Sequence, residues 1–138
     1  MRYVLDTNAV SALMKGEPRV VEKLRALDKS DAAVPQPVIA EIAYGIERLP
    51  RSKRRAALEE RFELVRTELP RVEWTDAVSE SFGTIKAALE RKGARIEDFD
   101  AAIAAHALAL EAVLVTANLD HMVRIPNLRV EDWTKSEG

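Results

Sequence analysis

The chain has 138 residues, and its 21 basic and 23 acidic side chains give a net charge of −2 at neutral pH. This near balance argues against a protein that binds nucleic acid through overall positive charge. The chain has no cysteine, which excludes disulfides, thiolate catalysis and thiolate metal sites. Its length predicts a single domain over residues 1–133, with residues 134–138 as a C-terminal tail.

No uncharged run approaches the roughly 20 residues that a membrane span needs. An acid at position 6 also interrupts any apolar signal-peptide core near the N-terminus. We therefore expect a soluble, cytoplasmic protein without membrane contacts. Basic residues gather at 48–55 and, in a smaller group, at 91–95, where they form either solvated helix ends or surfaces for a polyanion.

The first part of the chain predicts two strands that enclose two helices. Residues 3–5 form a short apolar strand that ends at Asp6. A helix is expected at about residues 9–15, and a second, with apolar residues at helical spacing, at about 18–27. Residues 32–34 then form a brief strand, which ends at the prolines that follow it.

The middle of the chain predicts a helical hairpin. A helix at about residues 38–48 carries Glu41 in its first turn, among apolar neighbours. A polar break follows, and a second helix is indicated by apolar residues at steps of four, three and four over residues 58–69. We expect this hairpin to stand partly off the core.

The last part of the chain predicts two helices and three strands. A long helix, capped by Asp76 and ended by Gly93, follows the first of these strands. The uncharged run at residues 101–110 is apolar on every side, which predicts a buried helix. The strands are expected at residues 71–75, 113–116 and 129–131.

Two carboxylates, Asp98 and Asp100, stand at the start of this buried helix. Asp is a good N-cap, and an anion is stabilised at the positive end of a helix dipole. One Asp would satisfy the cap, and Asp98 is the better cap candidate, so Asp100 requires a further explanation. We interpret it as part of a metal site.

Alternation of strands and helices predicts an α/β sandwich, in which a mostly parallel sheet is covered by helices on both faces. Ligands of such sheets bind beyond the carboxyl ends of the strands. Asp6, Thr116 and Asn118 each follow a strand, and Asp100 lies on the helix that feeds one of these strands. These polar residues are therefore expected to meet at one edge of the sheet.

Carboxylates gathered in one cleft repel one another unless a cation is present. Hard oxygen ligands suit Mg²⁺ or Mn²⁺, and magnesium held by one or two carboxylates plus waters is typical of phosphate-handling sites. Such an ion can activate water for displacement at phosphorus. The sequence has no competing nucleophile motif and no glycine-rich phosphate loop.

Each candidate also has a structural interpretation that the sequence leaves open. Asp6 serves equally as an N-cap, and Glu41 as a first-turn acid that complements its helix dipole. Thr116 and Asn118 are also residues that shape turns. His106, within the apolar helix, is more often a core residue than a ligand.

Taken in order, these segments resemble the PIN-domain ribonucleases. The resemblance rests on L-D-T-N at Leu5–Asn8, A-E-I-A-Y-G at Ala40–Gly45 and I-E-D-F-D-A-A-I-A-A-H-A-L at Ile96–Leu108. Two further segments are similar to the VapC-type toxins of bacterial toxin–antitoxin pairs: L-V-T-A-N at Leu114–Asn118 and R-I-P-N-L-R-V-E-D-W at Arg124–Trp133.

The resemblance implies a PIN-like three-layer α/β/α sandwich and a magnesium-dependent endoribonuclease, with Mn²⁺ as a possible substitute. It assigns Asp6 and Asp100 to the metal, and Glu41 and Asn118 to the remaining catalytic positions. Asp98, Thr116 and Thr7 are expected to support these ligands without binding the metal. Many relatives carry an additional acid where this chain has His121, so the number of metal ions stays open.

The resemblance also implies partners. We expect an RNA substrate, a VapB-type antitoxin that inhibits the enzyme, and a homodimer, with no direct DNA binding by this chain. The helical hairpin around residues 48–69 is where relatives hold the antitoxin and pair with a second subunit.

Two other functions stay open at this point. One is a catalytically silent PIN-like protein that binds RNA or acts as a scaffold. The other is a phospho-acceptor receiver domain, which is also an α/β fold with an acid after a strand. A receiver needs an acidic pair after its first strand and a lysine after its last main strand. This chain has a single acid there, and residues 113–133 contain no lysine.

Overall fold

The computed structural model describes residues 1–135 of the chain. Five parallel strands form one sheet in the order β3-β2-β1-β4-β5. The strands are β1 (Tyr3–Leu5), β2 (Ala32–Pro35), β3 (Arg71–Val72), β4 (Val113–Val115) and β5 (Val130–Glu131). The predicted α/β class is confirmed, and every strand pair in the described part of the chain is parallel.

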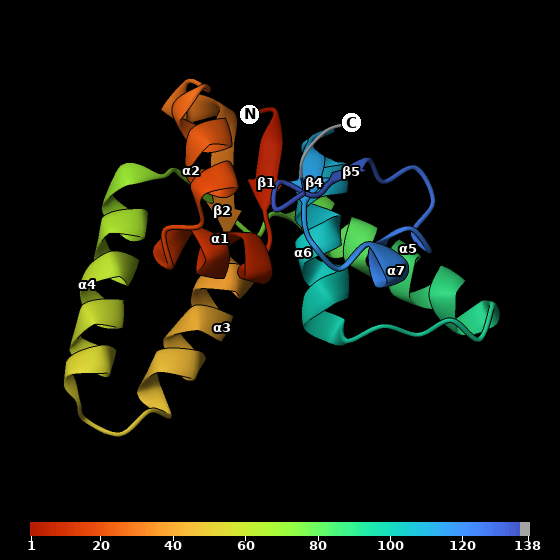
Figure 1. The fold of residues 1–138 in the computed structure, drawn as a ribbon. Helices are drawn as coiled ribbons and strands as arrows, with labels where there is room; N and C mark the ends of the chain where they lie inside the picture. Colours follow the sequence, from red (N-terminus) through yellow and green to blue (C-terminus); the bar gives the residue numbers. More distant parts are fainter. Residues whose placement is uncertain (136–138) are drawn as a thin grey trace.

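Helices cover the sheet from both sides (Figure 1). In Figure 1 α2 and α4 lie to the left of β1, α1 and α3 lie below β2, and α6 lies below β4 with α5 farther to the right. The helices are α1 (Thr7–Met14), α2 (Pro18–Arg25), α3 (Gln36–Glu47), α4 (Lys53–Glu68), α5 (Asp76–Arg91), α6 (Asp98–Ala109) and α7 (Leu119–Met122), with a 3₁₀ turn at Lys29–Asp31. Within residues 1–135, no helix combines the length and the apolar character that crossing a bilayer requires.

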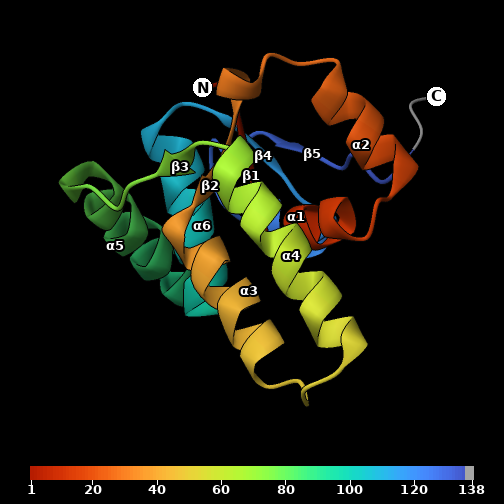
Figure 2. The same ribbon diagram turned by 90° about the vertical axis from the view of Figure 1, so that its left-hand side faces the viewer.

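The predicted helical hairpin consists of α3 and α4. Figure 2 shows the two helices side by side, with their connecting loop extending well below the sheet. The Ser52 hydroxyl caps α4 by accepting a hydrogen bond from the Arg55 N–H at 3.1 Å. The Arg55 guanidinium stabilises the loop between α3 and α4, because it donates hydrogen bonds to the Leu49 carbonyl at 2.9 Å and to the Glu47 carboxylate at 3.0 Å.

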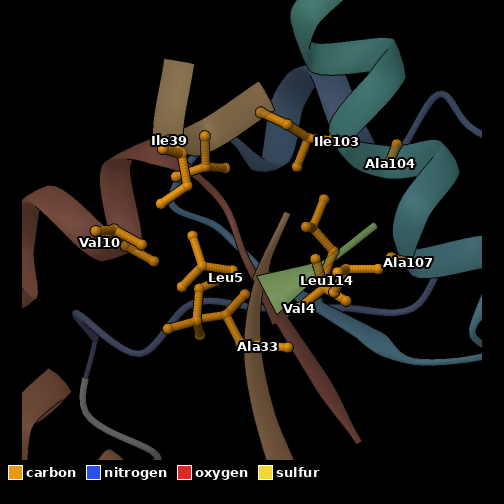
Figure 3. Close-up of a cluster of buried hydrophobic side chains, with 14 of the residues drawn as sticks. Val4, Leu5, Val10, Ala33, Ile39, Ile103, Ala104, Ala107 and Leu114 are labelled. Carbon is orange, nitrogen blue, oxygen red and sulfur yellow. The ribbon is translucent and has the colours of Figure 1, made fainter. Parts of the chain in front are cut away.

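The core lies on both sides of β1, the central strand (Figure 3). Val4 and Leu5 are completely buried, with aliphatic side chains of the neighbouring strands and helices around them. Helix α6 is the most buried helix, and its residues 101–107 are all buried. His106 is among them, with Nδ1 2.7 Å from the Ala102 carbonyl, so its interpretation as a core residue is confirmed.

Several predicted helix starts were wrong by one turn or less. Helix α1 begins at Thr7, and α3 begins at Gln36, so Glu41 lies beyond the first turn and does not act as a first-turn acid. The cap of α5 is Thr75, whose hydroxyl accepts from the Val78 N–H at 3.3 Å, and not Asp76. The reason is that α5 starts one residue earlier than predicted.

The ends of the chain and of two strands also differ from the prediction. Strand β3 has two residues and β5 has two, each shorter than predicted. In the predicted tail, Thr134 is held in place: its N–H donates to Asp132 at 2.9 Å, and its carbonyl accepts from Arg19 at 3.0 Å. Residues 136–138 of that tail lie outside the described residues.

Candidate active site

The order of the strands determines where a ligand site forms. From β1 the chain moves outward through β2 to β3, whereas β4 and β5 lie on the opposite side of β1. The connections after β1 and β4 therefore diverge, and such a switch point leaves a crevice at the carboxyl ends of the two strands. Asp6 follows β1 and Thr116 follows β4, so both residues lie at this crevice.

Asp6 combines a structural role with a buried charge. Its side chain is the N-cap of α1 and accepts a hydrogen bond from the Ala9 N–H at 3.0 Å. Only 3% of the residue is exposed. Burial raises the pKa of Asp6 from 3.8 to about 6, and repulsion from Asp100 adds to this rise, although hydrogen bonds from Thr116, Ala9 and Asn8 oppose it.

Asn8 joins the two strand ends across the crevice. Its side-chain amide donates to the Asp6 carboxylate at 3.0 Å, and its carbonyl oxygen accepts from the Ala117 N–H at 2.8 Å. Asn8 was not among the predicted site residues, although it is the third letter of the D-T-N segment. Its role depends on β1 lying beside β4, which no local pattern reveals.

Glu41 reaches the site from the second turn of α3. The Thr7 hydroxyl donates to its Oε1 at 2.5 Å, which orients the carboxylate. Thr7 was predicted to support the site, and this contact agrees with that role. Because Thr7 follows Asp6 directly, the hydrogen bond also ties α3 to the end of β1.

Asp100 lies in the first turn of α6 and is partly buried. Burial raises its pKa above the usual value, and the nearby charge of Glu41 raises it further, whereas His121 acts in the opposite direction. The charge of Asp100 in turn contributes to the raised pKa of Asp6. Asp6, Glu41 and Asp100 all line one cleft of about 610 Å³.

Two predicted residues follow β4 and do not line this cleft among the described residues. The buried Thr116 hydroxyl accepts from the Asn118 N–H at 2.9 Å, which shapes the turn after the strand. The Asn118 amide nitrogen lies 3.2 Å from Nδ1 of His121. Asn118 is therefore a neighbour of His121, whose charge acts on the pKa of Asp100.

Asp98 points to a different part of the surface. It is the first residue of α6 and follows the cap position of Glu97, so the prediction that Asp98 caps this helix was wrong. Its carboxylate pairs with Lys86 of α5 at 3.1 Å, and both side chains are well exposed. The described lining of the acidic cleft does not include it.

The acids have the chemistry of a site for a hard divalent cation. Within residues 1–135, no three acids or histidines are close enough to form a complete metal cage. A magnesium ion does not require one, because it keeps several waters and binds through one or two carboxylates. Burial and the charges of neighbouring acids raise the pKa of Asp6 and of Asp100, and a bound cation would offset both effects.

Known proteins resemble this chain over nearly its whole length. Residues 3–128 match the family model of the PIN domain. The chain belongs to the PIN-domain family. It is 34% identical to Ribonuclease VapC2 of Rickettsia felis over 98% of its own length and 100% of that protein. It is 32% identical to the tRNA(fMet)-specific endonuclease VapC of Salmonella typhimurium, over 96% of this chain and 98% of the relative.

A solved structure extends the likeness to the fold. The complex VapBC2 from Rickettsia felis, bound to a DNA fragment from its promoter, contains a chain that superimposes with a TM-score of 0.86. That chain is 31% identical, and the match covers 96% of this chain and 99% of the other. Within the PIN-domain family, the chain is thus a VapC-type ribonuclease of a toxin–antitoxin system, which excludes the receiver-domain alternative.

Proposed function

We propose that this PIN-domain ribonuclease cuts RNA with a divalent metal ion held by Asp6 and Asp100, and that residues 1–133 form its single catalytic domain. The observation that supports this proposal is the convergence of Asp6, Glu41 and Asp100 from three different elements on one cleft. The preferred ion is Mg²⁺, with Mn²⁺ able to substitute, because both take oxygen ligands.

In this proposal the metal ion, Asp6 and Glu41 have different roles in cleavage. When bound, the metal ion supplies charge neutralisation at the phosphate and an activated water. Asp6 is kept in one orientation by the Ala9 N–H and by Asn8. Glu41 has one oxygen engaged by Thr7, and its other oxygen accepts a proton from the water that attacks phosphorus.

Asn118 has a more distant role in this proposal. Its hydrogen-bonding contact with His121 holds a weakly basic ring near Asp100, where the ring opposes the repulsion from the other acids. Thr116 fixes the backbone of Asn118, and Asp98 contributes only through its ion pair with Lys86. We thus assign to Asp98 no direct part in catalysis.

The antitoxin is proposed to occupy a second cavity next to the acidic cleft. This apolar groove of about 660 Å³ lies between α1, α2 and α4, and it shares Lys15 and Gly16 with the cleft. Leu64 of α4 lines it and is 60% exposed, so an apolar side chain is available to a partner. A VapB-type chain that fills the groove would reach the acids at its end.

The other assignments rest on the family likeness alone. We propose a cytoplasmic homodimer that binds its antitoxin and leaves the contact with promoter DNA to that partner. Light scattering of the free protein tests the dimer. A gel-shift assay with the antitoxin-free protein tests the DNA assignment, which a shift of promoter DNA would refute.

The decisive experiment is RNA cleavage by antitoxin-free protein in the presence of Mg²⁺ or Mn²⁺. The Salmonella relative is named for tRNA(fMet), so that tRNA is the first substrate to test, beside bulk RNA. Cleavage that is lost with a chelator and in Asp100→Asn establishes the proposed activity. Cleavage that survives Asp100→Asn refutes the site, and no cleavage under any metal favours a catalytically silent RNA-binding protein.

A further inference from the structure

One wall of the acidic cleft is a single face of α1. Asn8, Ser11 and Lys15 follow one another at steps of three and four residues, so their side chains lie on the same side of the helix. All three line the cleft. At 1.5 Å per residue, the Cα atoms of Asn8 and Lys15 are about 10 Å apart along the helix axis. The face therefore runs from the acids to a cationic side chain at the far end.

Lys15 is the only basic residue in the described lining of this cleft. It is exposed, and among residues 1–135 it forms no ion pair. The neighbouring acid of the lining, Glu17, is already engaged, because its two oxygens accept from the N–H groups of Arg19 and Val20 at 3.4 Å. The Lys15 ammonium is thus available to a ligand.

We propose that Lys15, together with the Ser11 hydroxyl, binds a phosphate of the RNA next to the one that is cleaved. This subsite rests on the proposed function, because it orients the substrate of the same cleft. A lysine ammonium is a point charge that binds phosphate, and serine hydroxyls donate hydrogen bonds to phosphate oxygens. The cleft otherwise presents four carboxylates to a polyanion, so one cation at its end fixes the direction in which the strand enters.

The position of Lys15 also suggests how a bound antitoxin prevents RNA from binding. Lys15 lines both the acidic cleft and the apolar groove of α1, α2 and α4. A partner that fills the groove would cover Lys15, which lies where the groove adjoins the acidic cleft. The alternative assignment is that Lys15 serves the protein partner alone, and the experiment separates the two.

The test compares Lys15→Gln, which removes the charge, with Lys15→Arg, which keeps it. Lys135→Gln is the matched control, because Lys135 is an exposed lysine outside the cleft and outside both basic groups of the sequence. For RNA cleavage we expect KM to rise about tenfold in Lys15→Gln with kcat within about twofold, and the slope of log affinity against log salt to fall by about 0.7. Lys15→Arg restores KM, and Lys135→Gln leaves both quantities unchanged.

A second measurement locates the phosphate. A series of RNAs is made, each with one neutral methylphosphonate in place of one phosphate near the cleaved bond. Their binding to the protein is measured by fluorescence anisotropy in a buffer that contains Ca²⁺. Substitution at one position is expected to weaken binding to the wild type and to have no further effect on binding to Lys15→Gln. Unchanged RNA affinity in Lys15→Gln, or a loss confined to antitoxin binding, overturns the proposal. Because anisotropy needs no cleavage, an inactive wild type would count against the proposed function and leave this subsite testable.

Discussion

Replacing Asp6 with asparagine measures what the buried charge of the site does to the stability of the fold. Burial raises the pKa of Asp6 from 3.8 to about 6. The native state therefore binds a proton more tightly than the unfolded chain, and stability falls as pH rises through this window. Asparagine carries no charge and is an equally good N-cap, so the hydrogen bond from the Ala9 N–H is retained.

The size of the effect follows from the two pKa values. A rise from 3.8 to about 6 lowers the free energy of unfolding by about 3 kcal/mol at pH 7, where Asp6 is ionised in both states. At pH 4 the same two pKa values lower the free energy of unfolding by only about 0.5 kcal/mol. We thus expect Asp6→Asn to be more stable than the wild type by as much as about 3 kcal/mol at pH 7, and nearly equal to it at pH 4.

Urea denaturation in a chelator at pH 4, 5.5 and 7 gives this comparison. Asp98→Asn is the matched control, because it removes one acid from the same protein at a side chain that is 64% exposed and paired with Lys86. The control should show no stabilisation at pH 7. Equal stability of Asp6→Asn and wild type at pH 7, or a gain that persists undiminished at pH 4, would refute the electrostatic reasoning.

Three further predictions concern other residues of the site and the start of α5. In the RNA cleavage assay with Mg²⁺ or Mn²⁺, Asp100→Asn abolishes cleavage, whereas Asp98→Asn retains it. Asn8→Ala lowers the free energy of unfolding by about 1–3 kcal/mol in urea titrations, because it removes the hydrogen bonds with Asp6 and with Ala117, the second of which joins the ends of β1 and β4. Thr75→Ala lowers the free energy of unfolding by about 1 kcal/mol, because it removes the side-chain cap of α5, and it leaves RNA cleavage unchanged. Asp76→Ala removes only a favourable contact with the helix dipole, so it lowers the free energy of unfolding by less.

The sequence predicted the acids that line the cleft and the alternation of strands and helices because both depend on local patterns. An acid directly after an apolar strand, as at Asp6, lies at the carboxyl edge of a parallel sheet whatever the strand order. The buried helix after Asp100 was likewise evident from its uncharged run. These features need no knowledge of distant contacts.

The helix starts and the cross-strand contacts were not predictable in the same way. Thr75 and Asp76 are adjacent residues that both make good caps, and only the extended backbone at Thr75 decides between them. The bond from Ala117 to Asn8 joins residues 109 positions apart. It exists because β1 pairs with β4, and propensity and periodicity do not determine which strands become neighbours.

The strand order also explains why the charge of Asp6 is buried at all. The residue after β1 must lie between β2 and β4, where both neighbouring strands shield it, and the backbone N–H of Asp6 itself pairs with Val115 at 3.1 Å. An acid at this position is therefore desolvated by the sheet, and the charge of Asp100 repels it. A divalent cation that binds only the native state removes this destabilisation and adds stability by mass action, about 2.7 kcal/mol at a hundred times its Kd. We therefore expect the same placement that weakens the metal-free fold to favour cation binding at the proposed site.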